Sequence, residues 1–103
     1  KKNAFSWFEK SAISGYDKSQ FNLGTMYYNG DACLVDKEKS FFWIKKSAEQ
    51  DNAQAQFKLG IMYLLGDGTL TDKREAAFWI RKAYENNFGD AKEIWEKYEL
   101  WKF

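Results

Sequence analysis

The sequence has 103 residues, about the size of one domain, and 45% of them are hydrophobic, which excludes a disordered chain. Its formal net charge of +1 removes the electrostatic case for binding nucleic acid or an anionic membrane surface. With no histidine and one cysteine, Cys33, it cannot form a histidine-based triad, a Cys/His zinc site or an internal disulfide, and it predicts no catalytic residue, metal or cofactor.

The first part of the chain predicts two helices, over 3–14 and 18–29. Five residues of the second helix have the spacing i, i+4, i+7, i+8 and i+11, which places them in one stripe along a helix. They are Ser19, Leu23, Met26, Tyr27 and Gly30. Gly30 also stands where a helix end requires a left-handed residue, so it predicts the end of this helix.

The middle of the chain predicts helices over 37–50 and 53–65. Asp36 directly precedes the first of them and is a favourable N-cap residue. The second repeats the stripe of the helix before it. This copy of the stripe is Ala55, Leu59, Met62, Tyr63 and Gly66. The middle segment therefore has the same two-helix organisation as the segments around it.

The last part of the chain predicts helices over 73–86 and 89–101. Asp72 is the expected N-cap of the first, and Glu75 three residues later predicts a reciprocal capping box. Aromatic residues spaced along the final helix fit a helix that caps a stack. They include Trp95 and Tyr98.

The sequence contains an internal repeat of 36 residues. Trp7, Trp43 and Trp79 are each 36 positions apart, and residues 4–39 match residues 40–75 at 16 of 36 positions. That identity indicates a duplication, and repeats of this length are typical of helical solenoids. The third copy diverges after Ala91, as terminal repeats do where a stack faces water.

Glycines mark special positions in each copy. Gly24 and Gly60 lie inside predicted helices, where a glycine costs about 1 kcal/mol relative to alanine, so we interpret them as points of close helix packing. Gly66-Asp67-Gly68 lacks the strand and Lys-Ser/Thr of a phosphate-binding loop and is interpreted as a helix-ending turn. Ala32 replaces the second of these glycines in the preceding copy, so we expect that loop to be rearranged.

The predicted fold is an all-α solenoid of stacked helix-turn-helix pairs in a single domain, 1–103. We divide the domain into a partial repeat, two full repeats and a capping or truncated helix. Their bounds are 1–15, 16–51, 52–87 and 88–103. The chain opens on Lys1-Lys2-Asn3 without an initiator methionine, so we expect it to be a piece of a longer protein.

The repeat unit resembles the Sel-1-like repeat family, which is related to the tetratricopeptide repeats. The resemblance rests on Ala55-Gln56-Phe57-Lys58-Leu59-Gly60-Ile61-Met62-Tyr63, followed by Gly66-Asp67-Gly68 and later by Trp79-Ile80-Arg81-Lys82-Ala83. It implies a right-handed, tetratricopeptide-like superhelix. It also implies a bacterial protein-interaction scaffold whose first helices line a concave face.

Residues that recur in every copy are expected to serve stacking, because stacking is what every copy must do. We therefore predict a core role for the recurrent tryptophan, leucine and tyrosine positions. These are Trp7, Trp43, Trp79, Leu23, Leu59, Tyr27 and Tyr63. Cys33 is expected to pack under its loop beside Leu34.

Binding is expected where copies differ on the concave face. Phe21 and Phe57 recur and are at least partly structural, whereas Ile61, Leu64 and Leu65 form an unusually apolar set for a surface. The predicted protein-binding residues are Lys18, Thr25, Tyr28, Asn29, Gln54, Ile61, Leu64 and Leu65. Burial of the apolar set by flanking repeats or a neighbouring chain is the competing interpretation.

We thus predict a non-catalytic module that binds a protein or peptide on its concave face. The alternative is a structural spacer, or a segment that self-associates through its terminal helices, 3–14 or 89–101. The sequence predicts neither nucleic-acid binding nor membrane insertion.

Overall fold

The computed structural model describes the backbone of residues 2–103 and the side chains from Ala4 onward. It contains six α-helices and a short 3-10 turn, in agreement with the predicted all-α fold. The elements are α1 (Lys2–Ile13), α2 (Asp17–Asn29), α3 (Lys37–Glu49), α4 (Ala53–Leu65), α5 (Lys73–Glu85), α6 (Asp90–Lys97) and the turn η1 (Leu100–Lys102). The first five helices match their predicted ranges to within one residue at either end.

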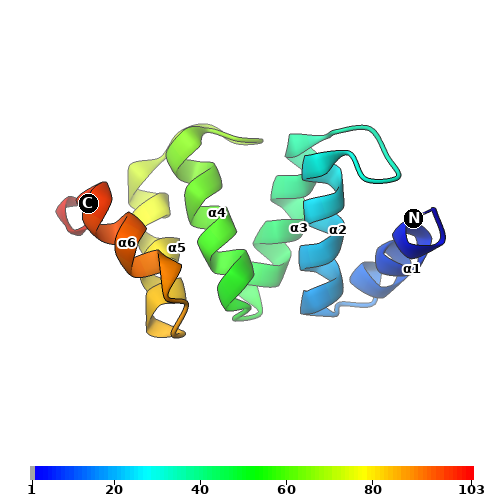
Figure 1. The fold of residues 1–103 in the computed structure, drawn as a ribbon, viewed down its shortest axis with the longest axis horizontal. Coiled ribbons are helices and arrows are strands. Elements are labelled where there is room, and N and C mark those ends of the chain that lie inside the picture. The colour runs from blue at the N-terminus through cyan, green and yellow to red at the C-terminus, as the bar shows by residue number, and fades with distance from the viewer. Residues whose placement is uncertain (1) are drawn as a thin grey trace.

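The helices stack in chain order into an elongated solenoid measuring 43 × 23 × 17 Å, with the two ends of the chain at opposite ends of the stack (Figure 1). Helices α2, α4 and α6 lie on the side nearer the viewer, in front of α3 and α5. The longer loops lie along one edge and the short turns along the other. We call the surface formed by α2, α4 and α6 the first-helix face.

Close contact at glycine holds the two helices of each repeat together, as predicted. A Cβ added to Gly24 would lie 2.7 Å from Ile44 Cγ1, and one added to Gly60 would lie 2.6 Å from Ile80 Cγ1. Both isoleucines are fully buried. The mid-helix glycines therefore give α2 and α4 the room to approach α3 and α5.

Consecutive repeats are joined by a recurrent aromatic pair. Phe5 of α1 meets Tyr27 of α2 edge-on with ring centroids 5.6 Å apart, and Phe41 of α3 meets Tyr63 of α4 in the same way at 5.3 Å. Perpendicular contacts of this kind are the favoured geometry for aromatic rings. The pair thus links the second helix of one repeat to the first helix of the next.

A buried glutamine in each full repeat bridges three helices. Gln56 Nε2 of α4 donates to the Ala48 carbonyl of α3, and Gln56 Oε1 accepts from Asn86, just after α5. Gln20 makes the equivalent bonds, donating to the Ala12 carbonyl of α1 and accepting from Gln50 after α3. The recurrent glutamine is therefore a polar tie within the core.

The predicted N-caps form, but the predicted capping box does not. The Asp36 carboxylate accepts from the Lys39 N–H, and the Asp72 carboxylate accepts from the N–H groups of Arg74 and Glu75. A capping box would also give the Asp72 N–H to the Glu75 side chain. That N–H instead donates to the Tyr63 carbonyl of α4 at 2.9 Å, because the loop folds back on the preceding helix.

The loop containing Ala32 is not rearranged, contrary to expectation. Ala32 adopts a left-handed φ of 59°, close to the 74° of Gly68 at the equivalent position. The N–H of Asp31 donates to the Met26 carbonyl just as that of Asp67 donates to Met62. The loop keeps its shape, and alanine bears the cost of the left-handed conformation, about 1–2 kcal/mol.

Most of the recurrent residues lie where a core role requires, with one clear exception. Leu23, Leu59, Tyr63 and Trp79 are buried, and Tyr27 and Trp43 are half-buried. The prediction for Trp7 is wrong, because its side chain is 61% exposed. Trp79, by contrast, packs in a cluster with residues of α4, the first helix of its own repeat.

The last predicted helix is also shorter than expected. It ends at Lys97, since Glu99 takes a left-handed φ of 51° and turns the chain. Leu100 then folds back and is fully buried beside Ile80 and Ala91. Of the two residues expected to cap the stack, Trp95 packs partly against this cluster, whereas Tyr98 is 42% exposed.

Replacing Gly60 with alanine tests the close helix contact. The added Cβ would collide with Ile80, so we expect Gly60→Ala to lower the free energy of unfolding by about 1–3 kcal/mol in urea titrations, despite alanine's higher helix propensity. Gly89→Ala is the matched control, because a Cβ there meets nothing within 4 Å and its backbone is already helical. Equal stabilities for the two variants would contradict the contact.

Replacing Gln56 with alanine tests the polar tie. The three hydrogen bonds of the Gln56 side chain, to Ala48, Asp51 and Asn86, disappear, so we expect a loss of about 2–3 kcal/mol in the free energy of unfolding. Gln54→Ala, on the exposed side of the same helix, should change it by less than about 0.5 kcal/mol. Similar effects from both substitutions would show that the buried glutamine does not hold the repeats together.

Candidate protein-binding face

The predicted binding residues divide into two groups by exposure. Thr25, Tyr28, Ile61 and Leu64 are half-buried, and Lys18, Asn29, Gln54 and Leu65 are exposed. The Thr25 hydroxyl donates to the Phe21 carbonyl of its own helix. The first-helix face is therefore partly made of side chains that also contact the neighbouring helix.

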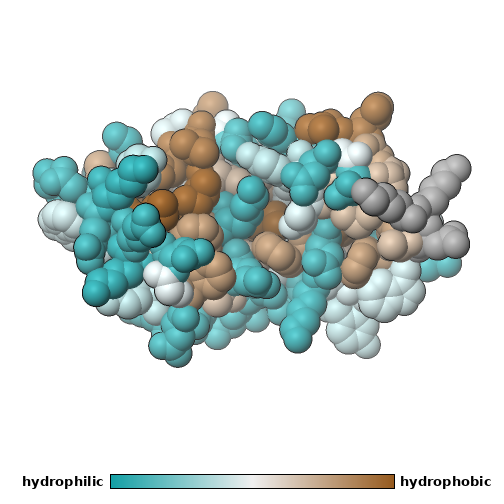
Figure 2. Space-filling model, in the orientation of Figure 1, coloured by the Kyte–Doolittle hydropathy of each residue, from teal (hydrophilic) through white to brown (hydrophobic). Residues whose placement is uncertain are grey.

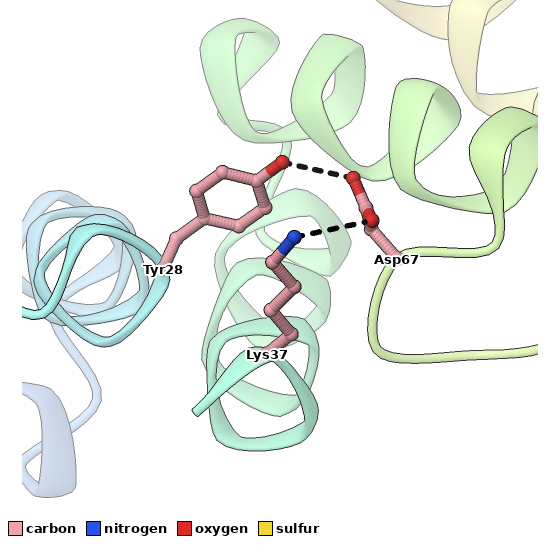
Figure 3. Close-up of polar contacts among 3 residues, drawn as sticks. All are labelled: Tyr28, Lys37 and Asp67. Atoms are coloured by element: carbon pink, nitrogen blue, oxygen red, sulfur yellow. Dashed lines mark hydrogen bonds and ion pairs between the residues drawn. The ribbon is translucent and has the colours of Figure 1, made fainter. Parts of the chain in front are cut away.

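Tyr28 lies in a polar cluster at the junction between α2 and α4 (Figure 3). Its hydroxyl donates to Asp67 Oδ2 at 2.8 Å, and Lys37 Nζ donates to Asp67 Oδ1 at 3.5 Å. Lys58 Nζ of α4 stands 3.7 Å from the centroid of the Tyr28 ring. Three helices and the loop after α4 thus meet in one set of side chains, which we call the polar junction: Tyr28, Lys37, Lys58 and Asp67.

The environment of the polar junction shifts two of its pKa values. The hydrogen bond to Asp67 raises the pKa of Tyr28, and burial and the negative charge of Asp67 raise it further. Burial lowers the pKa of Lys58; nearby Lys37 also lowers it, and Asp67 partly opposes the change. The Lys58 ammonium has therefore lost part of its hydration.

The next junction, between α4 and α6, is apolar at the same repeat positions. A shift of 36 residues carries Tyr28 to Leu64, Lys58 to Ile94 and Asp67 to Phe103. Leu64 and Ile94 pack partly against the core cluster of α5 and α6. Lys73, equivalent to Lys37, holds its ammonium 5.7 Å from the Phe103 ring centroid.

An apolar strip runs along the first-helix face beside this second junction. It consists of Ile61, Leu64, Leu65 and Ile94. Figure 2 shows hydrophobic surface running down this face over α4, with hydrophilic surface on both sides. Leu65 is the most exposed member, at 59%. A rimmed apolar patch of this kind is typical of an interaction surface.

Sequence reasoning identified Tyr28 but not the charged residues around it. Lys58 was detectable in principle, because its position differs in every copy, as Asn22, Lys58 and Ile94. The contact between Tyr28 and Asp67 spans 39 positions and depends on how one repeat sits on the next. Local periodicity carries no signal for such a contact.

Two further recurrent residues are exposed rather than packed. Leu34 and Leu70 occupy equivalent loop positions and are 89% and 86% exposed. The expectation that Cys33 packs under its loop is met in part: Cys33 is half-buried and its thiol donates to the Met26 carbonyl at 3.6 Å, whereas Leu34 is exposed. Burial, followed by the nearby acidic residues, raises the pKa of Cys33.

Open hollows lie between residues of α5 and α6. One of about 280 Å³ lies between Arg81, Tyr84, Glu85 and Trp95. In the part of the chain that the structure describes, no three acidic or cysteine residues gather closely enough to hold a metal ion. Likewise, none of the described helices has the length and apolar character needed to cross a membrane.

Comparison with protein families gives three matches to the Sel1 repeat, over residues 1–16, 17–52 and 53–88. Among solved structures, the chain is similar to a Sel1 repeat protein from Oxalobacter formigenes, with 36% identity and a TM-score of 0.86 over 87% of this chain. It is also similar to c5321, a protective antigen of uropathogenic Escherichia coli displaying an SLR fold, with 38% identity and a TM-score of 0.81 over 82% of this chain.

This chain spans 37% of the Oxalobacter protein and 18% of c5321. A third similar structure is the cysteine rich protein B of Helicobacter pylori, with a TM-score of 0.83 over 87% of this chain and 68% of that one. Its identity of 22% establishes a shared fold. No curated protein matches the sequence significantly.

The hydrogen bond from Tyr28 to Asp67 predicts a specific pH dependence. Because the folded state raises the pKa of Tyr28, its contribution to stability is complete below the unfolded value of about 10 and is lost as the pH rises through the folded value. We expect Tyr28→Phe to lower the free energy of unfolding by about 1 kcal/mol at neutral pH, with the difference from wild type shrinking above about pH 10.

Urea unfolding at several pH values measures this difference. Tyr84→Phe is the control, because Tyr84 is 45% exposed on α5 and makes no contact with the polar junction. A Tyr28→Phe penalty that stays constant through the alkaline range would contradict the assignment.

Proposed function

Because the chain belongs to the Sel1 repeat family, we propose that it is a non-catalytic module that binds a protein or peptide segment on the first-helix face. Sel1 repeat proteins are generally protein-interaction scaffolds. The observation that carries the proposal for this chain is the apolar strip, in which Leu65 leaves most of its side chain in water. Covering it would gain roughly 25 cal/mol for each Å² of apolar surface removed from water.

The strip is not a requirement of the repeat. The positions of Ile61, Leu64 and Leu65 are occupied in the preceding copy by Thr25, Tyr28 and Asn29, and α2 forms a helix with them. Ile61 and Leu64 pack partly against the core, but stacking does not account for the exposed side chain of Leu65. A bound partner would cover that side chain.

The architecture favours recognition by a preformed surface. Gly60 against Ile80 and the tie at Gln56 fix α4 in place, and the strip lies on the outer side of that same helix. On binding, most of the loss of conformational entropy would then fall on the bound segment, while the structure of the module changes little.

Exposed side chains of α1 and of the turn after it favour a second candidate, self-association of the chain. Trp7, Ile13 and Tyr16 are 61%, 71% and 65% exposed at one end of the stack. A second copy of the chain that packs against this end would bury these side chains, as a neighbouring repeat buries those inside the stack. Sedimentation velocity over a range of concentrations tests this: dimerisation that Trp7→Lys removes and Leu65→Lys leaves intact would favour it over the first-helix face.

Peptide selection from a random library tests the main proposal. We expect the selected peptides to shift backbone amide resonances in α2, α4 and α6, and Leu65→Glu to weaken their binding at least tenfold. Leu70→Glu is the matched control, because it places the same charge on a leucine that is exposed but lies in a loop. Peptides that instead shift resonances around Arg81 and Tyr84, and bind Leu65→Glu unchanged, would place the binding site at the hollow between α5 and α6.

A further inference from the structure

This inference rests on the proposed function and specifies its ligand. We propose that the first-helix face recognises a segment with an acidic side chain that pairs with Lys58 and an aliphatic side chain, about three residues away, that covers Leu65. Lys58 belongs to the polar junction and Leu65 to the apolar strip. Each step rests on the surroundings of these two residues.

The first step is that Lys58 is held in place. Its ammonium lies 3.7 Å from the Tyr28 ring centroid, a cation–π contact that orients it. The ring itself is fixed through its hydroxyl, which donates to Asp67, and Asp67 is fixed in turn by Lys37. A bound carboxylate would therefore meet an ammonium whose position is already set.

The second step is the balance of charge at the polar junction. Two ammonium groups, on Lys37 and Lys58, surround the carboxylate of Asp67, which already accepts from Tyr28 and from Lys37. Among the described residues, no carboxylate oxygen lies within 4.0 Å of Lys58 Nζ. The junction is left with an excess positive charge on a half-buried ammonium, and a ligand carboxylate would compensate it.

The third step is the spacing between the charge and the apolar strip. Lys58 and Leu65 are seven positions apart on α4, so they lie on one face of the helix about 10 Å apart along its axis. An extended peptide covers that distance in about three residues. The segment thus has the pattern Glu-x-x-Leu or its reverse, Leu-x-x-Glu.

The repeat itself does not require a lysine at the position of Lys58. The same repeat position is Asn22 in α2 and Ile94 in α6, and all three helices stack. A basic residue appears there in the copy where the neighbouring helix supplies Tyr28 and the following loop supplies Asp67. Its chemistry therefore belongs to the surface and not to the repeat.

Synthetic peptides test the inference directly. The probes are octapeptides of glycine and serine with blocked ends that carry Glu-x-x-Leu or Leu-x-x-Glu. In one set of control peptides glutamine replaces the glutamate. In a second set the glutamate is removed and the C-terminus is left as a free carboxylate. Binding is followed to millimolar peptide by amide chemical shifts, which detect weak complexes. We expect one order of the glutamate peptides to bind at least fivefold tighter than its glutamine counterpart.

The protein variant for this test is Lys58→Met, which keeps the length and apolar stem but removes the charge. It should abolish the preference for glutamate over glutamine, and added salt should weaken the wild-type preference. Lys92→Met, at an exposed position on α6, is the control. It should keep both the preference for glutamate and the weakening of that preference by salt. Thermal unfolding confirms that each variant folds, and Lys58→Gln replaces the methionine variant if it does not.

The outcomes separate this inference from the function on which it rests. If library-selected peptides occupy the first-helix face but show no preference for an acid and bind Lys58→Met unchanged, the function stands and the inference is overturned. A preference for the free C-terminal carboxylate over the glutamate side chain, or no shifts with either order, also overturns it. Binding at the hollow between α5 and α6 overturns both this inference and the proposed function.

Discussion

The close packing of a glycine against an isoleucine sets the geometry on which the rest of the structure depends. An alanine at Gly24 or Gly60 would place its Cβ within 2.7 Å of the facing isoleucine, so α2 with α3 and α4 with α5 pack at a separation that other residues do not permit. The recurrent leucines, the aromatic pairs and the buried glutamines all fit around that spacing. In α6 the equivalent residue is Glu96, and the 36-residue pattern ends there.

Two sets of residues with different duties share the same helices. The inner set, which consists of the recurrent glycines, leucines, aromatic residues and glutamines, recurs because every repeat must pack closely against its neighbours and form hydrogen bonds with them. The outer set differs from copy to copy: Tyr28 and Lys58 make the α2/α4 junction polar, whereas Leu64 and Ile94 make the α4/α6 junction apolar. Lys58 and most of the apolar strip therefore lie on the same helix, α4, so the proposed segment would meet a charge and an apolar surface together.

The sequence predicted what local periodicity and capping determine, and it missed what depends on neighbours. Five helices, the caps at Asp36 and Asp72 and the glycine contacts follow from spacing within one repeat. The exposure of Trp7 and the end of α6 do not, because the first depends on which helices pack against α1 and the second on a left-handed residue, Glu99. At the candidate site, copy-to-copy differences identified Tyr28 and Leu65, but the partners of Tyr28 lie in other repeats.

The free energy of unfolding of the double variant Tyr28→Leu/Lys58→Ile tests most directly whether stacking and recognition are separate. The variant places the leucine and isoleucine of the α4/α6 junction, Leu64 and Ile94, at the equivalent two positions of the α2/α4 junction. We predict a cooperative transition within about 1.5 kcal/mol of wild type, the size of a well-accommodated core change. A loss above about 3 kcal/mol would show that the polar junction holds the repeats together, and the division between an inner stacking set and an outer binding set would be wrong.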